Sequence, residues 1–158
     1  MGEDTFSTFF AAAEPRLRRA FVAAYGSDRG REATAEALAY GWEHWTEVER
    51  MHNPTGYLYR VGTTAARREL RRRDRTELRA DASDHTAHED HPGDPDLERA
   101  LAHLTDRQRA AVVLVVGHGM PLREAAALLG CSISSLRNHV DRALRHLRNE
   151  LEHDDAAE

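Results

Sequence analysis

The sequence of 158 residues contains one cysteine, no lysine and no long hydrophobic run. A single cysteine, Cys131, excludes an internal disulfide and gives no sign of an oxidising compartment. The longest apolar run, AAVVLVV at 110–116, is too short to cross a bilayer, so we expect no membrane segment. The first 25 residues mix acids and arginines with short apolar stretches, unlike a signal peptide. These absences predict a soluble protein of the cytoplasm.

Because lysine is absent, all 22 basic residues are arginine, and they are unevenly spread along a chain whose formal net charge is −5. Residues 60–80 hold eight arginines against three acids, whereas residues 81–98 hold seven acids and no arginine. Residues 99–151 are basic again. A guanidinium group binds phosphate oxygens in pairs, so two basic segments separated by an acidic spacer indicate two nucleic-acid-binding surfaces. The alternative is that the arginine clusters are only solvated faces.

Hydrophobic residues recur at three- and four-residue steps, and no segment shows the sustained two-residue alternation of a strand. The predicted fold class is therefore all-α. Pro15 is expected to divide the first helical stretch in two. Thr105 and Gln108 have the spacing of a capping box, at the start of a helix predicted to run to Val116.

Two small helical domains joined by a flexible acidic linker account for this pattern. We expect a helical domain over residues 1–76, the linker over 77–96, a helix-turn-helix domain over 97–151 and an acidic tail over 152–158. The stretch DASDHTAHEDHPGDPD (81–96) has no apolar face, two prolines and one glycine, which is typical of mobile linkers. His85, His88 and His91 within it are metal ligands by type. Their three-residue spacing suits metal ligands on a helix, but this segment is not expected to be helical. A spacer without metal is therefore the favoured interpretation.

Residues 122–148 have the pattern of a helix-turn-helix. A short helix with alanines at its packing positions ends at Gly130, and a longer helix with a polar face follows. When Leu136 and Val140 point inward, hydroxyl, amide and guanidinium groups lie on the open side, where they could read base edges in a major groove. The candidate DNA-binding residues are Ser134, Ser135, Arg137, Asn138, His139, Arg142 and Arg145. An ordinary helical hairpin with a solvated face is the alternative.

Three stretches resemble one family, in the family's own order. LTDRQRAAVVLVVGHGMPLREAAALLGCSISSLRNHVDRALRHLR (104–148) is similar to region 4 of the bacterial extracytoplasmic-function sigma factors, whose last helix reads the −35 promoter element. EATAEALAYGWEHW (32–45) resembles region 2.2, and NPTGYLYRVGTTAARRELRRR (53–73) resembles regions 2.3 and 2.4. The resemblance spans most of the chain.

The resemblance implies that the first arginine-rich stretch, within residues 60–80, lies against opened promoter DNA at the −10 element. Single strands are held by guanidinium contacts to phosphate together with flat faces for stacking, which agrees with this use. The implied −10 residues are Asn53, Tyr57, Tyr59, Arg60, Thr63, Thr64, Arg67, Arg68 and Arg71. Residues 51–53 would correspond to the family's base-capturing loop. One of the two tyrosines is expected to belong to the core.

The resemblance also implies that region 2.2 docks on a coiled coil of the largest subunit of core RNA polymerase. The candidate contacts are Glu32, Glu36, Ala39, Tyr40 and Glu43, with a merely solvated acidic surface as the alternative. Trp42 and Trp45 on the same stretch are expected in the core.

The expected function is that of a sigma factor, which gives core RNA polymerase its promoter specificity and helps to open DNA. The implied partners are core polymerase, promoter DNA and an anti-sigma factor. No catalytic serine, histidine and acid arrangement, phosphate loop or carboxylate pair stands out, so we expect neither an enzyme nor a bound cofactor or metal. One alternative is a LuxR-type regulator, because SSLRNHVDRAL (134–144) also resembles a LuxR recognition helix. The other is a sigma mimic that sequesters an anti-sigma protein.

Overall fold

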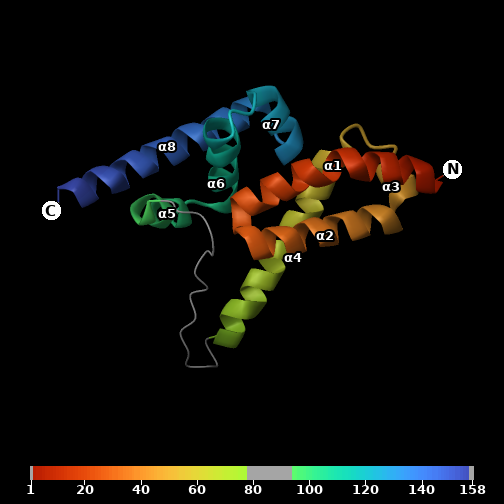
Figure 1. The fold of residues 1–158 in the computed structure, drawn as a ribbon, viewed down its shortest axis with the longest axis horizontal. Coiled ribbons are helices and arrows are strands. Elements are labelled where there is room, and N and C mark those ends of the chain that lie inside the picture. The colour runs from red at the N-terminus through yellow and green to blue at the C-terminus, as the bar shows by residue number, and fades with distance from the viewer. Residues whose placement is uncertain (1, 78–93, 157–158) are drawn as a thin grey trace.

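The computed structural model describes residues 2–77 and 94–156, and every regular element in these ranges is helical, as predicted (Figure 1). The elements are α1 (Gly2–Tyr25), α2 (Ser27–Glu43), α3 (Trp45–Val48), α4 (Pro54–Glu77), α5 (Pro95–Ala102), α6 (Asp106–Val112), the π-helical turn η1 (Val113–Gly117), α7 (Leu122–Leu129) and α8 (Ile133–Asp155). None of these helices is long and apolar enough to cross a membrane. The predicted linker lies outside the described residues except at its two ends, and His85, His88 and His91 lie outside them altogether.

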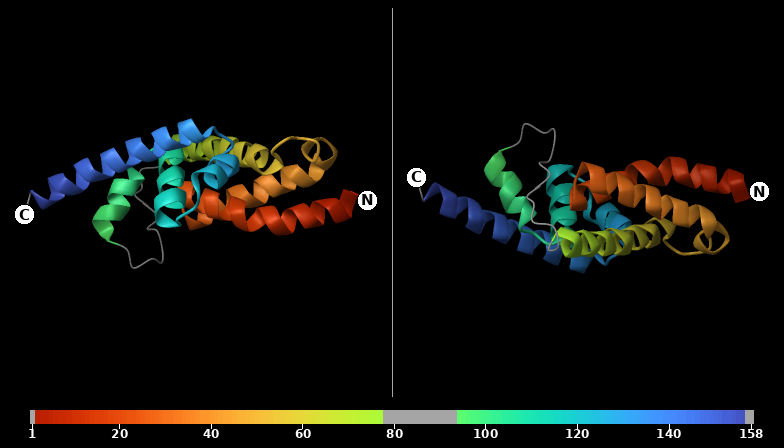
Figure 2. Two further views of the ribbon diagram at one scale, coloured as in Figure 1. Left: turned by 90° about the horizontal axis from the view of Figure 1, so that it is seen from above. Right: turned by 90° about the horizontal axis from the view of Figure 1, so that it is seen from below.

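In the N-terminal half (α1–α4), α1 and α2 form an antiparallel hairpin that α4 crosses (Figures 1 and 2). Glycine permits the close approach within the hairpin, because a Cβ atom at Gly30 would lie 2.6 Å from the Cα of Val22. Phe21 of α1 is fully buried and stacks on Tyr59 of α4, with ring centroids 4.8 Å apart. Gly62 leaves room for the Phe21 ring, so these aromatic contacts fix where α4 lies.

The first helix is continuous through Pro15, so the prediction of two short helices is wrong. Proline removes one helical hydrogen bond, but Pro15 lies on the exposed side of α1, where water can reach the carbonyl group left without a partner. The buried side continues past it through Ala13, Leu17 and Phe21. The packing of this side outweighs the local cost of the proline.

The C-terminal half (α5–α8) contains the predicted cap and the predicted helix-turn-helix. At the start of α6 the Thr105 hydroxyl accepts a hydrogen bond from the Gln108 N–H, and the Gln108 side chain accepts one from the Thr105 N–H. α7 ends at Gly130, whose φ of 65° is left-handed. Ser132 then caps α8 by accepting a hydrogen bond of 3.1 Å from the Ser135 N–H.

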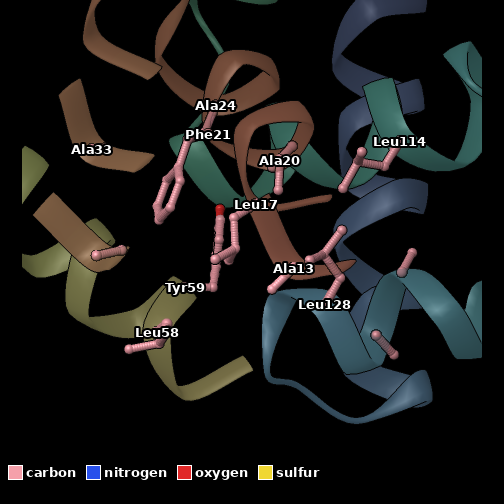
Figure 3. Close-up of a cluster of buried hydrophobic side chains, with 14 of the residues drawn as sticks. Ala13, Leu17, Ala20, Phe21, Ala24, Ala33, Leu58, Tyr59, Leu114 and Leu128 are labelled. Carbon is pink, nitrogen blue, oxygen red and sulfur yellow. The ribbon is translucent and has the colours of Figure 1, made fainter. Parts of the chain in front are cut away.

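The two halves pack against each other and share one hydrophobic core. Leu17 and Phe21 of the N-terminal half belong to the same buried cluster as Leu114 and Leu128 of the C-terminal half (Figure 3). A second, smaller cluster lies within the C-terminal half, where Leu104 and Leu147 help to hold α5 and α6 on α8. The shared core places the start of α4 beside α7 and the turn that follows it.

Candidate nucleic-acid interface

One side of α8 is buried and the other is open. Leu136 is fully buried, and Val140, Ala143 and Leu147 continue the same apolar side. The opposite side, which we name the recognition face, consists of Ser134, Arg137, Asn138, Arg142 and Arg145, all of them exposed. The three arginines of this face form no hydrogen bond or ion pair with any described part of the chain. Their guanidinium groups are therefore free to bind an external acceptor.

Two further predicted residues flank the recognition face. Ser135 is exposed, but its backbone N–H and its hydroxyl are both bonded to Ser132, so it also belongs to the helix cap. His139 is half-buried, and burial, followed by the charges of Arg107 and Arg142, lowers the pKa of its imidazole. A neutral imidazole lies here among cations.

The −10 candidates on α4 do not form one open surface. Tyr59 and Thr63 are buried, and Tyr59 is the tyrosine of the pair that belongs to the core. Burial is the main reason that the pKa of Tyr59 is raised well above its usual range. Tyr57 is half-buried, with its hydroxyl 3.2 Å from that of Tyr40. Stacking on a base would therefore require Tyr57 rather than Tyr59.

Three more −10 candidates bind the C-terminal half of the protein itself. Asn53 Nδ2 donates to the carbonyl oxygen of Ala127 at 2.8 Å, and Arg60 Nη2 donates to that of Gly130 at 2.7 Å. Arg67 binds Asp106 with two hydrogen bonds, described below. These contacts join positions that no pattern in the sequence indicates as a pair.

Asp106 accepts hydrogen bonds from a charged and a neutral donor on two helices of the N-terminal half. Its two carboxylate oxygens accept from Arg67 Nε and Nη2 at 2.8 and 2.9 Å, and the Tyr25 hydroxyl donates to it at 2.7 Å. Burial raises the pKa of the Asp106 carboxyl, but the hydrogen bonds from Arg67 and Tyr25 lower it more, so its pKa lies below the ordinary value. Asp106 is therefore a charged anchor between the halves.

The remaining candidates, Thr64, Arg68 and Arg71, are exposed. Further along α4, Arg72 and Arg73 both bind Glu69, and these hydrogen bonds lower the pKa of Glu69 to about 2. The acid within the arginine cluster thus neutralises part of it. Among the −10 candidates, Arg68 and Arg71 are thus the arginines that remain open to DNA, although Arg71 Nε also donates a hydrogen bond of 3.4 Å to the Arg67 carbonyl of its own helix.

The five predicted polymerase contacts on α2 lie on two sides of the helix. Glu32 and Glu36 border a small cavity shared with α4, and Glu32 lies 3.6 Å from Arg73. Tyr40 also faces α4 through Tyr57. Ala39 instead borders an open groove between α1 and α2, with a volume of about 680 Å³. Glu43 is exposed at the end of α2.

The groove shows that one core prediction is wrong. Trp45 is buried as expected, but Trp42 is 49% exposed, with one side packed edge-on against Phe6 and the other open to solvent. Phe10 is 42% exposed beside it, and Leu38 and Ala39 complete the apolar lining. Sequence reasoning missed this surface. The available signal was the small side chains before Trp42 on the same side of α2. Ala35 and Ala39 precede it at steps of four and then three residues, and no large side chain covers this side.

Comparison with known proteins first identifies the C-terminal half. Residues 95–147 match the family described as Sigma-70, region 4. These residues include α6, α7 and most of α8, so the helix-turn-helix with its recognition face lies in the part of the chain that is similar to sigma-70 region 4.

Most of the chain is also similar to particular known proteins. The ECF RNA polymerase sigma factor EcfG of Rhodopseudomonas palustris (strain TIE-1) is 27% identical over 147 residues, which cover 89% of this chain and 81% of that protein. The sigma factor RpoE, solved with the anti-sigma factor NepR from Bartonella quintana, is 23% identical, with a TM-score of 0.66 over 94% of this chain and 97% of that chain. CnrH, solved with the cytosolic domain of CnrY, is 22% identical, with a TM-score of 0.58 over 96% of this chain and 90% of that chain. The two structures show the shared fold, and the matches to region 4 and to EcfG support the prediction of an extracytoplasmic-function sigma factor.

Proposed function

We propose that this protein is a sigma factor that binds core RNA polymerase in the cytoplasm, directs it to specific promoters and assists DNA opening. The observation that carries the proposal is the recognition face of α8. It is anchored by a buried apolar side, leaves three arginines without a bond to any described residue, and lies within the region that matches Sigma-70, region 4. The protein then acts through binding, and the chemistry belongs to the polymerase.

The recognition face is proposed to read the −35 element in the major groove. Arg137 and Asn138 lie in the first turns of α8, and residues at the start of a recognition helix are those that reach base edges. Arginine pairs with guanine and asparagine with adenine through two hydrogen bonds each. Arg142 and Arg145 lie further along the same side, where phosphate contacts are expected.

The start and middle of α4 are proposed to bind the −10 element as a single strand. Arg68 and Arg71 are open in the present arrangement and supply phosphate contacts. Asn53, Arg60 and Arg67 become available only if the C-terminal half moves away from them. Promoter binding by α4 therefore includes a change in the relation of the two halves.

Core polymerase is proposed to bind α2 through the coiled coil of its largest subunit. The predicted contacts Glu36, Ala39 and Glu43 are exposed, and the groove adds Phe10 and Trp42. An exposed apolar groove rimmed by charged residues fits one face of an amphipathic helix. An anti-sigma factor is a further proposed partner. RpoE was solved with the anti-sigma factor NepR, and CnrH was solved with the cytosolic domain of CnrY.

A run-off transcription assay with purified core polymerase tests the function. Stimulated initiation at discrete positions on a library of genomic templates supports the sigma factor. Duplex binding without stimulation would favour the LuxR-type regulator, although the matches reported above are all sigma factors. Binding of an anti-sigma protein with neither activity would favour the sigma mimic.

A pair of variants tests the polymerase surface. Trp42→Ala should weaken core binding in a pull-down with purified core polymerase, because it removes the largest exposed apolar side chain of the groove. Glu47→Ala, an exposed change on α3, is the control. Equal binding by both variants would place the polymerase contact elsewhere.

A further inference from the structure

The contact between α4 and the C-terminal half uses groups that the proposed function assigns to DNA. Arg67 presents its planar fork to both oxygens of Asp106, at 2.8 and 2.9 Å. This paired geometry is also how a guanidinium group binds the oxygens of a phosphate. The Asp106 side chain is only 19% exposed, and it approaches Arg67 from the other half of the protein. One anionic group thus fills the Arg67 fork.

Two further donors, Arg60 on α4 and Asn53 just before it, are filled by the end of α7. Arg60 donates to the Gly130 carbonyl and Asn53 to the Ala127 carbonyl. Carbonyl groups at the C-terminal end of a helix carry partial negative charge and lack some of their helical partners. The C-terminal half therefore presents one full and two partial negative charges to three donors that extend from Asn53, just before α4, to Arg67 in the middle of α4.

The fit is close at the backbone as well. A Cβ atom at Gly56 would lie 2.8 Å from the Ala127 carbonyl oxygen, and one at Gly130 would lie 3.1 Å from the Gly56 carbonyl oxygen. Glycine at these two positions lets α4 and the end of α7 approach until the polar contacts form. Arg109 adds a hydrogen bond of 2.6 Å in the other direction, to the carbonyl of Ala24.

We propose that Asp106 and the C-terminal end of α7 act as an internal stand-in for DNA phosphate, so that the helix-turn-helix half inhibits DNA binding by α4 in the free protein. The inference rests on the proposed function, because it assumes that Arg67 and its neighbours bind a nucleic acid. A donor bonded to Asp106 cannot also bind a phosphate, so DNA and the C-terminal half compete for the same groups. By thermodynamic reciprocity, a strand bound to α4 favours separation of the halves to the same extent.

The test measures DNA affinity and shape on the full chain. Asp106→Asn removes the carboxylate charge and keeps the side-chain shape. Asp28→Asn, on the exposed first turn of α2, makes the same change in net charge and is the matched control. Fluorescence anisotropy with a labelled single-stranded oligonucleotide of mixed sequence measures affinity, and small-angle X-ray scattering measures the radius of gyration.

We expect Asp106→Asn to bind the oligonucleotide roughly fivefold or more tightly than wild type, which is the lower range of coupling between linked sites. Its radius of gyration should increase, and Asp28→Asn should match wild type in both measurements. Adding Arg67→Ala to Asp106→Asn should abolish the gain, because Arg67 is the donor that Asp106 releases. Equal affinity of Asp106→Asn and Asp28→Asn would overturn the proposal, and so would a gain that survives the loss of Arg67.

A second variant opens the contact without changing charge. Gly56→Ala places its Cβ atom against both the Asn53 amide and the Ala127 carbonyl that this amide binds, and it should also tighten oligonucleotide binding and expand the protein. If circular dichroism shows that Asp106→Asn is poorly folded, Gly56→Ala decides the question. An oligonucleotide affinity of Gly56→Ala equal to that of wild type would then overturn the proposed inhibition. Failure of the sigma factor proposal looks different, since wild-type protein would then not stimulate core polymerase in the run-off assay.

Discussion

The two arginine-rich helices, α4 and α8, use the same side chain in opposite ways. On α4, Arg60 and Arg67 bind the C-terminal half, and Arg72 and Arg73 bind Glu69 of their own helix. On α8, the arginines of the recognition face form no hydrogen bond or ion pair with the described chain. Arginine content therefore identifies a basic helix but does not tell whether its charges are available.

The difference arises from the neighbours of each helix. α8 lies at the outer side of the C-terminal half (Figure 2). It packs against α6 with its apolar side buried, and its recognition face is exposed. α4 lies between α1 and α2 on one side and α7 on the other, so acceptors from both halves come within reach. An arginine next to a packed element binds an acceptor of the protein itself, whereas an arginine on an outer face remains available to an external ligand.

The largest effect should come from the buried side of α8. Leu136→Ala should lower the free energy of unfolding by about 2–5 kcal/mol, since Leu136 is fully buried and the cavity would persist. Ile133→Ala, on the same helix but 37% exposed, should cost clearly less. Urea unfolding followed by circular dichroism measures both. Equal costs would show that α8 is not anchored by this side, and the contrast with α4 would lose its basis.

The next effect concerns the open arginines. Arg137→Ala should weaken binding to the −35 element by about 1–3 kcal/mol and relax the base preference at one position, if this arginine reads a base. Arg148→Ala, exposed further along α8, is the control and should change affinity little. Gel-shift titrations on the preferred site and on single-base variants measure this. An equal loss on every sequence would make Arg137 a phosphate contact.

A smaller effect should separate the exposed from the paired arginines of α4. Replacing Arg68 and Arg71 by alanine should flatten the salt dependence of promoter opening, by about 0.7 in the log–log slope for each lost single-strand phosphate contact. Replacing Arg72, which is paired with Glu69, should flatten it less. Permanganate footprinting at several salt concentrations gives the slopes. A reversed order would mean that pairing within α4 does not govern availability.

The smallest effect is expected on acidification. Because the pKa of Asp106 in the folded protein is below its ordinary value, Asp106 stabilises the fold above its unfolded pKa of about 3.9. This contribution is lost as the pH falls through the folded pKa. Asp106→Asn should therefore lose less stability than wild type when the pH is lowered from about 5 to about 3. Parallel losses in urea titrations would exclude Asp106 as a charged anchor.

The features predicted correctly depend on residues close together in the sequence. The capping box at Thr105 and the stop at Gly130 are set within a few residues, and both are present. The open side of α8 follows from the helical period of Leu136 and Val140. The failures at Pro15 and Trp42 depend on neighbours from other helices, which no local pattern contains.

The sequence by itself determined the all-helical fold, the cap at Thr105, the stop at Gly130, the helix-turn-helix and the resemblance to sigma factors, because helical periodicity and capping act over one or two turns. Only the tertiary structure decided which arginines are free. Arg67 meets an acid 39 positions away, and Arg60 meets a carbonyl 70 positions away. Such pairings are set by how the two halves pack around their shared core, and the same packing assigns half of the predicted −10 surface to the protein itself.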